Sequence, residues 1–311
     1  MQTVLGANGQ IAVELAREIA RTQDDVLRLV SRNPRAVNDT DALVRADLLD
    51  AEQTSAAVRG SDVVYFTAGL PPRTTLWEQQ FPTMLRHALD AARAAGARFA
   101  YFDNTYMYPQ DDRVQTEDVA FAPVGRKGTV RAAMASMVLE EMHRGDIPVL
   151  IARAPEFYGP GRTQSFTNTL VLDRIKTGRR ALVPVRADRE RTLIWTPDVS
   201  RALALLGSTP DAYGQTWHLP TPAHRPTYRE LVSLAADTFG SSGRYTVLPR
   251  VVLRGLGAVS PQVRELRELL PRYAHQNRFD STAFTARFPD FPVTSYAEGL
   301  DRIRQEARPA L

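Results

Sequence analysis

The first half of the chain alternates short apolar runs with longer stretches in which apolar residues recur every three or four positions. The short runs are typical of buried strands, and the longer stretches have the spacing of helices with one buried face. The expected strands are Thr3–Leu5, Val26–Val30, Ala42–Arg45, Val63–Thr67, Arg98–Asp103 and Pro148–Arg153. The expected helices are Gln10–Arg21, Ala51–Arg59, Leu76–Ala95 and Lys127–His143. This alternation predicts a doubly wound α/β fold, with a parallel sheet covered by helices on both faces.

The pattern changes after Pro155, where prolines and glycines become frequent and strand-like and helix-like segments mix. The segment TLIWTPDVSRALALL at 192–206 predicts a strand that enters a helix, with Pro197 in the first turn of that helix. A further helix is expected after Thr227, because Glu230 stands three residues later and completes a capping box.

The length of 311 residues is sufficient for two domains. We expect the first domain at 1–155 and a smaller C-terminal α/β lobe at 156–311. Segments at about 190–207 are expected to return to the sheet of the first domain.

The composition is that of a globular protein, since 43% of the residues are hydrophobic and 24% are charged. The chain contains no cysteine, which excludes disulfides, thiolate metal sites and cysteine nucleophiles. Its five histidines are dispersed without the spacing of metal ligands, so we expect no metal site. The G-x-S-x-G motif of hydrolases is also missing.

The formal net charge is +4, and the arginines are scattered along the chain, so no nucleic-acid partner is expected. No apolar stretch approaches the ~18 residues that a membrane span needs. The chain enters its first strand without a basic, cleavable leader. We therefore expect a cytoplasmic protein with a small-molecule substrate and no membrane partner, either a monomer or a homodimer.

The segment LGANGQIA at 5–12 joins the first strand to the first helix through Gly6 and Gly9. Such a turn places backbone N–H groups and the positive end of a helix at one point, which suits a pyrophosphate. Gly6 permits the turn, Gly9 permits close approach, and Ala12 lets the helix lie near the strand. The spacing G-x-x-G-x-x-A is also compatible with a plain strand-to-helix turn. Dinucleotide binding is the better interpretation, because this is the first βαβ unit.

The second strand ends with Ser31 and Arg32 where NAD-preferring sites usually carry an acid for the ribose hydroxyls. An arginine there suits a 2′-phosphate, so the sequence favours NADPH or NADP⁺ over NADH. The alternative is a solvated loop arginine in an arginine-rich protein. Asp47 follows the third strand, and its carboxylate either meets the adenine amino group or caps the next helix.

Only two of the 39 basic residues are lysines, Lys127 and Lys176. Lysine can release a proton near neutral pH when its environment shifts its pKa, whereas arginine cannot. Each lysine of this chain is therefore a candidate for a special role.

Five segments in the right order resemble the extended short-chain dehydrogenase/reductase family, which includes nucleotide-sugar epimerases and dehydratases. They are LGANGQIA at 5–12, ADLLDA at 46–51, FTAG at 66–69, RAPEFYGPG at 153–161 and RTLIWTPDV at 191–199. The resemblance implies a Rossmann domain that binds a nicotinamide dinucleotide, and a substrate cleft between this domain and the C-terminal lobe.

The glycine turn and the resemblance together assign a set of residues to the cofactor. These are Gly6, Asn8, Gly9, Gln10 and Ile11 at the pyrophosphate, Ser31, Arg32, Asp47 and Leu48 at the adenosine, Thr67, Ala68 and Gly69 behind the cofactor, Lys127 at the ribose, and Ala154, Pro155 and Phe157 near the nicotinamide.

The family's chemistry normally rests on a Ser or Thr hydroxyl and on Tyr and Lys in a Y-x-x-x-K motif. Here the corresponding segment is PVGRK, so Lys127 is present and Pro123 stands in the tyrosine position. Aligning the family's V-Y-G with Met107, Tyr108 and Pro109 places Asn104 where the hydroxyl residue would be. An asparagine can still donate a hydrogen bond to a carbonyl oxygen.

Three interpretations of this altered site follow. In the first, Tyr106 supplies the proton, with Thr105 and Tyr108 as weaker candidates, and Asn104, Tyr106 and Lys127 are the catalytic residues. Tyr106 is equally compatible with an aromatic wall of the cleft. In the second, the substrate or water supplies the proton, for example from a phenol beside the ketone, and the enzyme contributes orientation. In the third, the protein senses NADP(H) without catalysis.

The candidate substrate-binding residues are Tyr106, Tyr108, Tyr158, Trp195 and Arg191. The aromatic residues, together with Phe157, would suit a flat ring system if they line one cleft, and the alternative is that half of them belong to the core. The resemblance places Arg191 where relatives often meet a substrate phosphate. An ion pair near Asp198 is the other interpretation.

These observations favour an NADPH-dependent ketoreductase of atypical active site. The substrate class suggested by analogy with atypical relatives is an aromatic polyketide in antibiotic biosynthesis. A non-catalytic NADP(H)-sensing regulator is the first alternative. A nucleotide-sugar epimerase or dehydratase is the second, because epimerisation needs a base near neutral pKa and none is evident.

Overall fold

The chain forms two units in the computed structural model, which describes residues 1–306 except 24, 162, 164, 253–264 and 266. The first unit contains residues 1–107, 126–154 and 199–219, and the second contains 108–125, 155–198 and 220–311.

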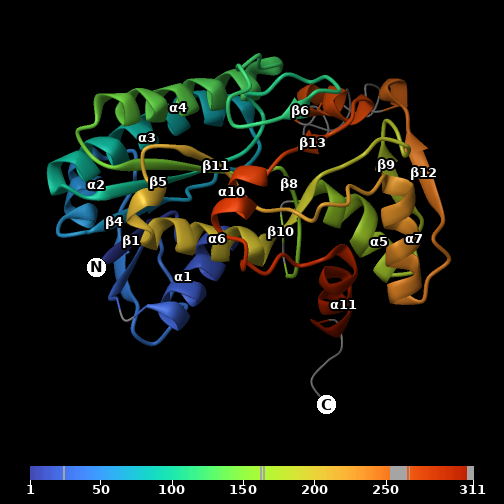
Figure 1. The fold of residues 1–311 in the computed structure, drawn as a ribbon, viewed down its shortest axis with the longest axis horizontal. Coiled ribbons are helices and arrows are strands. Elements are labelled where there is room, and N and C mark those ends of the chain that lie inside the picture. The colour runs from blue at the N-terminus through green and yellow to red at the C-terminus, as the bar shows by residue number, and fades with distance from the viewer. Residues whose placement is uncertain (24, 162, 164, 253–264, 266, 307–311) are drawn as a thin grey trace. The chain divides into compact units, whose positions relative to one another are not determined.

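A seven-stranded parallel sheet forms the centre of the first unit (Figure 1). Its spatial order is β11-β7-β5-β4-β1-β2-β3. The strands are β1 (Gln2–Leu5), β2 (Leu27–Ser31), β3 (Ala42–Arg45), β4 (Val63–Phe66), β5 (Arg98–Asp103), β7 (Val149–Arg153) and β11 (Thr216–His218). All four residues of β1 and of β4 are buried, as expected for central strands covered on both faces.

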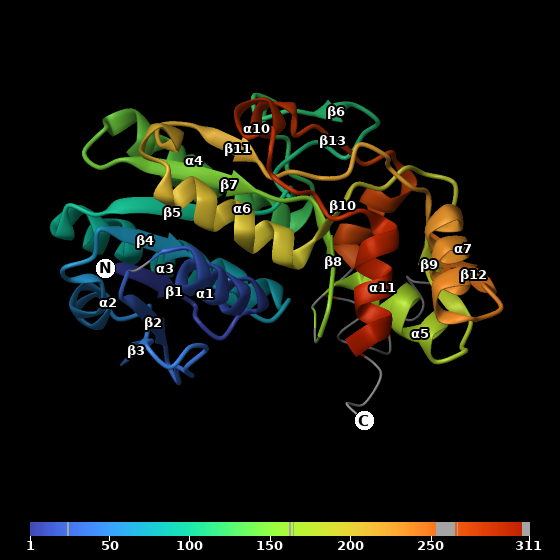
Figure 2. The same ribbon diagram turned by 60° about the horizontal axis from the view of Figure 1, so that its bottom comes forward.

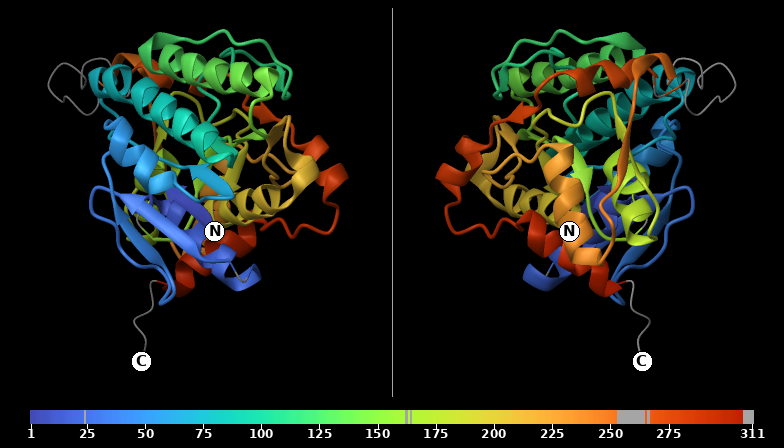
Figure 3. Two further views of the ribbon diagram at one scale, coloured as in Figure 1. Left: turned by 90° about the vertical axis from the view of Figure 1, so that its left-hand side faces the viewer. Right: turned by 90° about the vertical axis from the view of Figure 1, so that its right-hand side faces the viewer.

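Helices cover both faces of this sheet. They are α1 (Gln10–Thr22), α2 (Ala51–Val58), α3 (Thr74–Ala95), α4 (Gly125–Arg144) and α6 (Thr196–Ser208). Residues of α2, α3 and α4 share one apolar core with the sheet, whereas α1 and α6 lie together on the opposite face (Figures 2 and 3). The Ser200 hydroxyl joins these two helices by donating to the Ile11 carbonyl at 2.9 Å.

The second unit consists of three parallel strand pairs and several short helices. The pairs are β8 (Glu156–Tyr158) with β10 (Leu193–Trp195), β9 (Ala181–Pro184) with β12 (Tyr245–Leu248), and β6 (Val114–Gln115) with β13 (Arg278–Phe279). The helices include the π-helix η1 (Thr167–Leu172), α5 (Asp173–Lys176), α7 (Tyr228–Phe239), η3 (Arg267–Ala274), α10 (Thr282–Arg287) and α11 (Tyr296–Glu306). Their apolar faces form a separate core around Tyr158, Trp195 and Tyr296.

The predicted α/β fold is confirmed, and the expected strands and helices of the first half are present with ends displaced by at most two residues. The capping box is also confirmed, since the Thr227 side chain accepts from the Glu230 N–H and the Glu230 carboxylate accepts from the Thr227 N–H.

Of the segment at about 190–207 that was expected to return to the first domain, residues 199–207 lie in α6 and belong to the first unit, but the strand of this segment does not join the large sheet. The strand of that segment, β10, pairs with β8 in the second unit, and the last strand of the large sheet is β11. With only three residues between polar and glycine-containing segments, β11 is too short to give a strand pattern. The segment 108–125 also departs from the expected boundaries, because it clusters with the second unit.

Among the helices that the structure describes, none combines the length and the apolar character that crossing a membrane would require.

Candidate functional site

The glycine turn between β1 and α1 has the geometry that the sequence predicts. Gly6 has φ +94°, a conformation that side chains rarely adopt. A Cβ atom on Gly6 would lie 2.5 Å from the Ala68 Cα atom. Gly6 therefore permits both the turn and the close approach of the loop that follows β4.

The start of α1 suits an anion. Gly9 is the N-cap and carries no side chain, the first helical turn contains no acidic residue, and Asn8 and Gly9 are exposed. Gln10 and Ile11 begin the helix, whose N-terminal end carries a partial positive charge. The Asn8 side chain donates to the Asn33 carbonyl at 2.8 Å and ties this turn to the loop after β2. The turn thus fits the pyrophosphate of a dinucleotide.

The loop after β2 presents an arginine to solvent. The Ser31 hydroxyl accepts from the Asn33 N–H at 3.2 Å, and the Arg32 side chain between them is exposed. No acidic residue ends β2, so the chain provides a cation where a ribose hydroxyl or a 2′-phosphate would lie.

Asp47 does not cap the next helix, which removes one of its two predicted roles. Its carboxylate accepts from the Leu49 N–H at 3.1 Å in a local turn. The N-cap of α2 is Asp50, which accepts from the Gln53 N–H at 3.0 Å. Leu48 is buried, and an adenine contact of Asp47 stays a prediction.

The segment after β4 lies beside the glycine turn, because β4 and β1 are neighbours in register. The Thr67 hydroxyl donates to the Leu5 carbonyl at 3.0 Å, and Gly69 is exposed. Thr67, Ala68 and Gly69 are therefore placed next to the predicted pyrophosphate site.

Asn104 follows β5, and its side chain has a defined orientation. The Asn104 Oδ1 atom accepts from the Tyr106 N–H at 2.9 Å. Because a backbone N–H needs an acceptor, the oxygen must face Tyr106, and the amide Nδ2 group is left as the donor. Asn104 is thus held so that it can donate to a carbonyl oxygen.

The Tyr106 ring stacks on Trp77 of α3, with ring centroids 6.2 Å apart and an interplanar angle of 13°. Trp77 is itself fixed by a hydrogen bond from its Nε1 to the Pro71 carbonyl at 2.8 Å. Tyr106 is half-buried. The structure is therefore compatible with both predicted roles of Tyr106, a proton donor or an aromatic wall of the substrate cleft.

Lys127 is completely buried in the first turn of α4. Its ammonium donates to the Thr74 hydroxyl, the first residue of α3, at 2.5 Å. Its chain neighbour Arg126 is bonded to Glu78, and this hydrogen bond lowers the pKa of the Glu78 carboxyl. Lys127 and Tyr106 therefore both contact the first turn of α3, at Thr74 and Trp77, respectively.

A buried cluster, Asp103 with Arg131 and Arg153, lies directly beside the Asn104 loop. One oxygen of Asp103 accepts from Arg131 Nη2 at 2.6 Å, and the other accepts from Arg153 Nε at 3.4 Å. Arg131 stands one helical turn after Lys127 on the same face of α4. The Ala154 N–H donates to the Asp103 carbonyl at 3.0 Å. This cluster fixes the ends of β5 and β7 relative to α4.

Three of the aromatic residues expected at the substrate, Tyr108, Tyr158 and Trp195, are buried in the second unit. Tyr158 and Trp195 are fully buried, with ring centroids 5.2 Å apart. Tyr108 is also buried, and its ring lies 6.1 Å from that of Phe121. The structure thus favours the core alternative for these three residues. Pro155 and Phe157 belong to the second unit, and their contact with the cofactor stays a prediction.

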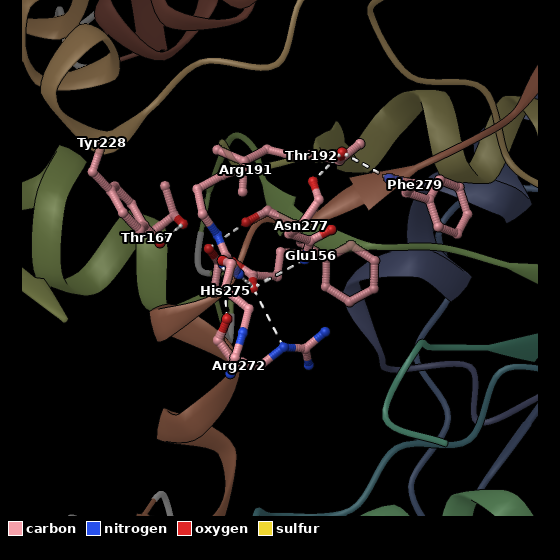
Figure 4. A network of polar contacts seen from close by, with 12 residues as sticks. Glu156, Thr167, Arg191, Thr192, Tyr228, Arg272, His275, Asn277 and Phe279 are labelled. Carbon is pink, nitrogen blue, oxygen red and sulfur yellow. Dashed lines mark hydrogen bonds and ion pairs between the residues drawn. The ribbon is translucent and has the colours of Figure 1, made fainter. Parts of the chain in front are cut away.

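Arg191 forms the ion pair that the sequence left open, but its partner is Glu156 rather than Asp198. Figure 4 shows Arg191, Arg272 and Asn277 converging on Glu156. The same carboxylate oxygen, Oε1, pairs with Arg191 Nη2, lies 3.6 Å from Arg272 Nε and accepts from Asn277 Nδ2 at 3.5 Å. Asp198 accepts from the Thr294 N–H and hydroxyl.

Sequence reasoning missed Thr74, Asp103 and Arg131 in the first unit, and Glu156, Arg272 and Asn277 in the second. The spacing of Lys127 and Arg131 on one helix face was a usable signal. Thr74 and Glu156 gave none, because their partners are distant in sequence.

No group of three or more His, Cys, Asp or Glu side chains in the described part of the chain is arranged to hold a metal ion.

The model of a family described as "NAD dependent epimerase/dehydratase family" matches residues 2–219. No curated protein matches the chain in sequence.

Several solved structures share the fold. One is the UDP-glucuronic acid 4-epimerase from Bacillus cereus in complex with UDP-glucuronic acid and NAD, with TM-score 0.78, 18% identity and coverage of 98% of this chain and 100% of that one. Another is MoeE5 in complex with UDP-glucose and NAD, with TM-score 0.75, 20% identity and coverage of 99% of both chains. A third is a double mutant of the dTDP-glucose 4,6-dehydratase DesIV from Streptomyces venezuelae with NAD bound, with TM-score 0.76, 17% identity and coverage of 98% and 96%.

Proposed function

The chain belongs to the NAD-dependent epimerase/dehydratase family, and from this premise we propose that it reduces a ketone of a small molecule with a nicotinamide cofactor. The observation that carries the proposal is the orientation of Asn104. Its Oδ1 atom accepts from the Tyr106 N–H, which leaves the amide Nδ2 group as the donor for a carbonyl oxygen of the substrate.

In this proposal, two side chains of the first unit serve the reaction. The Asn104 amide stabilises the negative charge that develops on the carbonyl oxygen during reduction. The buried ammonium of Lys127 would hold the ribose hydroxyls of a bound cofactor. When bound, the nicotinamide supplies the hydride.

Tyr106 supplies the proton in this proposal. Pro123 cannot exchange a proton, whereas the Tyr106 hydroxyl is carried by the same loop as Asn104. Replacing Tyr106 by Phe removes the hydroxyl and keeps the stacking on Trp77. A fall in turnover of about 100-fold supports this role, since general acid catalysis contributes about 10²–10⁴-fold. Unchanged turnover would assign the proton to the substrate or to water.

We propose NADPH as the preferred cofactor, supported by the exposed Arg32 after β2. As the substrate we propose an aromatic ketone with a phenol beside the carbonyl, of the kind found in polyketide antibiotics. Such a phenol stabilises the developing alkoxide through an internal hydrogen bond.

The experiment is deuteride transfer from 4-deuterated NADPH and NADH to a panel of ketones, half of which carry a phenol beside the carbonyl. Deuterium in a product supports the reductase. Tight cofactor binding without transfer to any ketone would contradict it and favour a sensor.

A nucleotide-sugar epimerase or dehydratase is the second candidate. It is supported by the family and by similar structures in complex with UDP-sugars and NAD. Incubating the protein and NAD with UDP-glucose and UDP-glucuronic acid tests it. A new sugar product would replace the first proposal.

A further inference from the structure

The Asn8 side chain joins two segments of the first unit that the sequence assigns to different phosphates of the cofactor. Asn8 lies in the glycine turn between β1 and α1, at the predicted pyrophosphate site. Its amide Nδ2 donates at 2.8 Å to the Asn33 carbonyl, in the loop that carries Arg32 at the predicted site of the 2′-phosphate. Because a carbonyl oxygen only accepts, the Nδ2 group of Asn8 must face Asn33. The Asn8 amide is therefore a direct link between the two predicted phosphate sites.

The backbone on both sides of Arg32 is fixed by hydrogen bonds. Before it, at the end of β2, the Ser31 carbonyl accepts from the Ala46 N–H at 3.0 Å. After it, the Asn33 N–H donates to the Ser31 hydroxyl at 3.2 Å, and the Asn33 carbonyl accepts from Asn8. The Arg32 side chain itself is exposed. Asn8 thus fixes the residue directly after Arg32 relative to the glycine turn.

The remainder of this loop is held by other groups. The Asp41 carboxylate accepts from the N–H groups of Val37 and Asn38 at 2.8 and 2.7 Å. The Asn38 side chain in turn donates to the Ala16 carbonyl of α1 at 3.1 Å. These hydrogen bonds do not involve Asn8. Replacing Asn8 should therefore affect the residues around the exposed arginine and leave the rest of the loop in place.

A fixed backbone matters for a long side chain that binds a phosphate. Binding immobilises the arginine side chain, and motion of the backbone that carries it adds to this entropic cost. The saving applies only to a ligand that contacts the arginine. NAD⁺ and NADP⁺ share the pyrophosphate, and only NADP⁺ has the 2′-phosphate. An effect that acts through Arg32 therefore changes the ratio of the two affinities, whereas a contact with the pyrophosphate changes both affinities equally.

We propose that the Asn8 side chain is a positioning residue for cofactor specificity, which holds the loop after β2 so that Arg32 meets the 2′-phosphate. The inference deepens the proposed preference for NADPH and rests on it. It assigns the Asn8 side chain to the loop, in place of a direct contact with the pyrophosphate.

The test measures the dissociation constants of NADP⁺ and NAD⁺ by calorimetry for the wild-type protein, Asn8→Ala, Arg32→Ala and the double variant Asn8→Ala/Arg32→Ala. We expect Asn8→Ala to lower the preference for NADP⁺ by about fivefold, the contribution of one hydrogen bond, and to leave NAD⁺ binding nearly unchanged. When Arg32 is already replaced, the change at Asn8 should have no further effect on the preference, because two residues that act together are not additive.

Asn33→Ala is the matched control. Only backbone atoms of Asn33 take part in the hydrogen bonds on either side of Arg32, so this variant should keep the wild-type preference for NADP⁺. Asn8 is exposed and its φ lies outside the left-handed region, so Asn8→Ala should fold.

Three results would overturn the inference. The first is an equal loss of affinity for both cofactors in Asn8→Ala, which would assign the side chain to the pyrophosphate. The second is a preference that Asn8→Ala leaves unchanged, or lowers equally with and without Arg32. The third is a wild-type protein without preference for NADP⁺, which contradicts the proposed cofactor as well. Deuteride transfer to ketones tests the reaction and does not enter these constants, so a failure of the reaction is distinguishable from a failure of the inference.

Discussion

Two buried clusters of one carboxylate and two arginines lie in the two units, and they use the carboxylate differently. In the first unit each oxygen of Asp103 takes one arginine, at 2.6 Å for Arg131 and 3.4 Å for Arg153. In the second unit both arginines meet the same oxygen of Glu156, and the other oxygen is buried without a hydrogen-bond partner in the described residues.

The difference follows from the elements that carry the charges. Asp103 and Arg153 are register partners on adjacent parallel strands, so the sheet itself sets their separation. Glu156 lies at the start of the short strand β8, whereas Arg272 comes from a 3-10 helix more than a hundred residues later. A carboxylate with both oxygens paired, such as Asp103, joins the elements that carry its partners. A carboxylate with one oxygen unpaired within the described residues, such as Glu156, leaves part of its hydrogen-bonding capacity unused.

Removing the carboxylate of the first cluster should have the largest effect. Asp103→Asn leaves two buried arginines without their counterion, and breaking a buried pair in this way costs about 3–5 kcal/mol. Urea denaturation measures the free energy of unfolding. The matched control is Asp111→Asn, which removes an exposed partner of Arg113 and should cost less than about 1 kcal/mol. Equal losses of unfolding free energy in the two variants would mean that the Asp103 cluster does not hold β5, β7 and α4 together.

Lys127 stands one helical turn before Arg131 of the first cluster. Replacing it tests whether its ammonium contributes to cofactor binding. Lys127→Met keeps most of the apolar stem and removes the ammonium. NADPH binding should weaken by about 10–100-fold, since hydrogen bonds to a charged group contribute about 1.5–3 kcal/mol. Fluorescence titration of NADPH measures the dissociation constant. Lys176→Met is the control, because Lys176 is the other lysine of the chain and is exposed; an unchanged affinity in Lys127→Met would remove Lys127 from the cofactor site.

Thr74 should have a smaller effect, because it acts on the ligand only through Lys127. Thr74→Val removes the hydroxyl that accepts from the Lys127 ammonium and keeps the shape of the side chain. We expect about tenfold weaker NADPH binding, the equivalent of about 1.4 kcal/mol. Thr74→Ser should restore the affinity. If Thr74→Ser and Thr74→Val bind NADPH with the same affinity, the hydroxyl does not position Lys127.

The two units differ also in how far the sequence predicts their candidate residues. Lys127 lies in the first turn of a regular helix and Asn104 directly follows a regular strand, as motif and periodicity predict, and their roles in a site stay predictions. Tyr158 and Trp195 occupy equally clear motif positions, yet the structure buries both in a core. A motif gives the position of a residue along the chain. Which side of a strand faces the core depends on distant partners such as Tyr296, whose ring centroid lies 5.4 Å from that of Tyr158.

The partners of the buried charges were the least predictable feature. Arg191 pairs with Glu156, which is 35 residues away, and not with the expected acid seven residues away. The register of β8 and β10 places Glu156 opposite Leu193, two residues from Arg191, whereas Asp198 lies in α6 and accepts from Thr294. Register of such short strands is not encoded in any local pattern.

Arg32 can be compared with the buried arginines of the two clusters, because its side chain is exposed to solvent. Arg32 is exposed after β2, so reversing its charge should leave the free energy of unfolding within about 0.5 kcal/mol of the wild-type value. Arg32→Glu should instead lower the affinity for NADPH by about tenfold and spare NADH, because a carboxylate repels the 2′-phosphate and accepts from the ribose hydroxyls. Arg35→Glu, three residues later and also exposed, is the matched control for a change of net charge alone. The ratio of kcat/KM for the two cofactors, or of their dissociation constants, measures the effect. An equal shift in both variants would mean that the cofactor responds to the overall charge of the loop, and Arg32 would then have no specific contact with the 2′-phosphate.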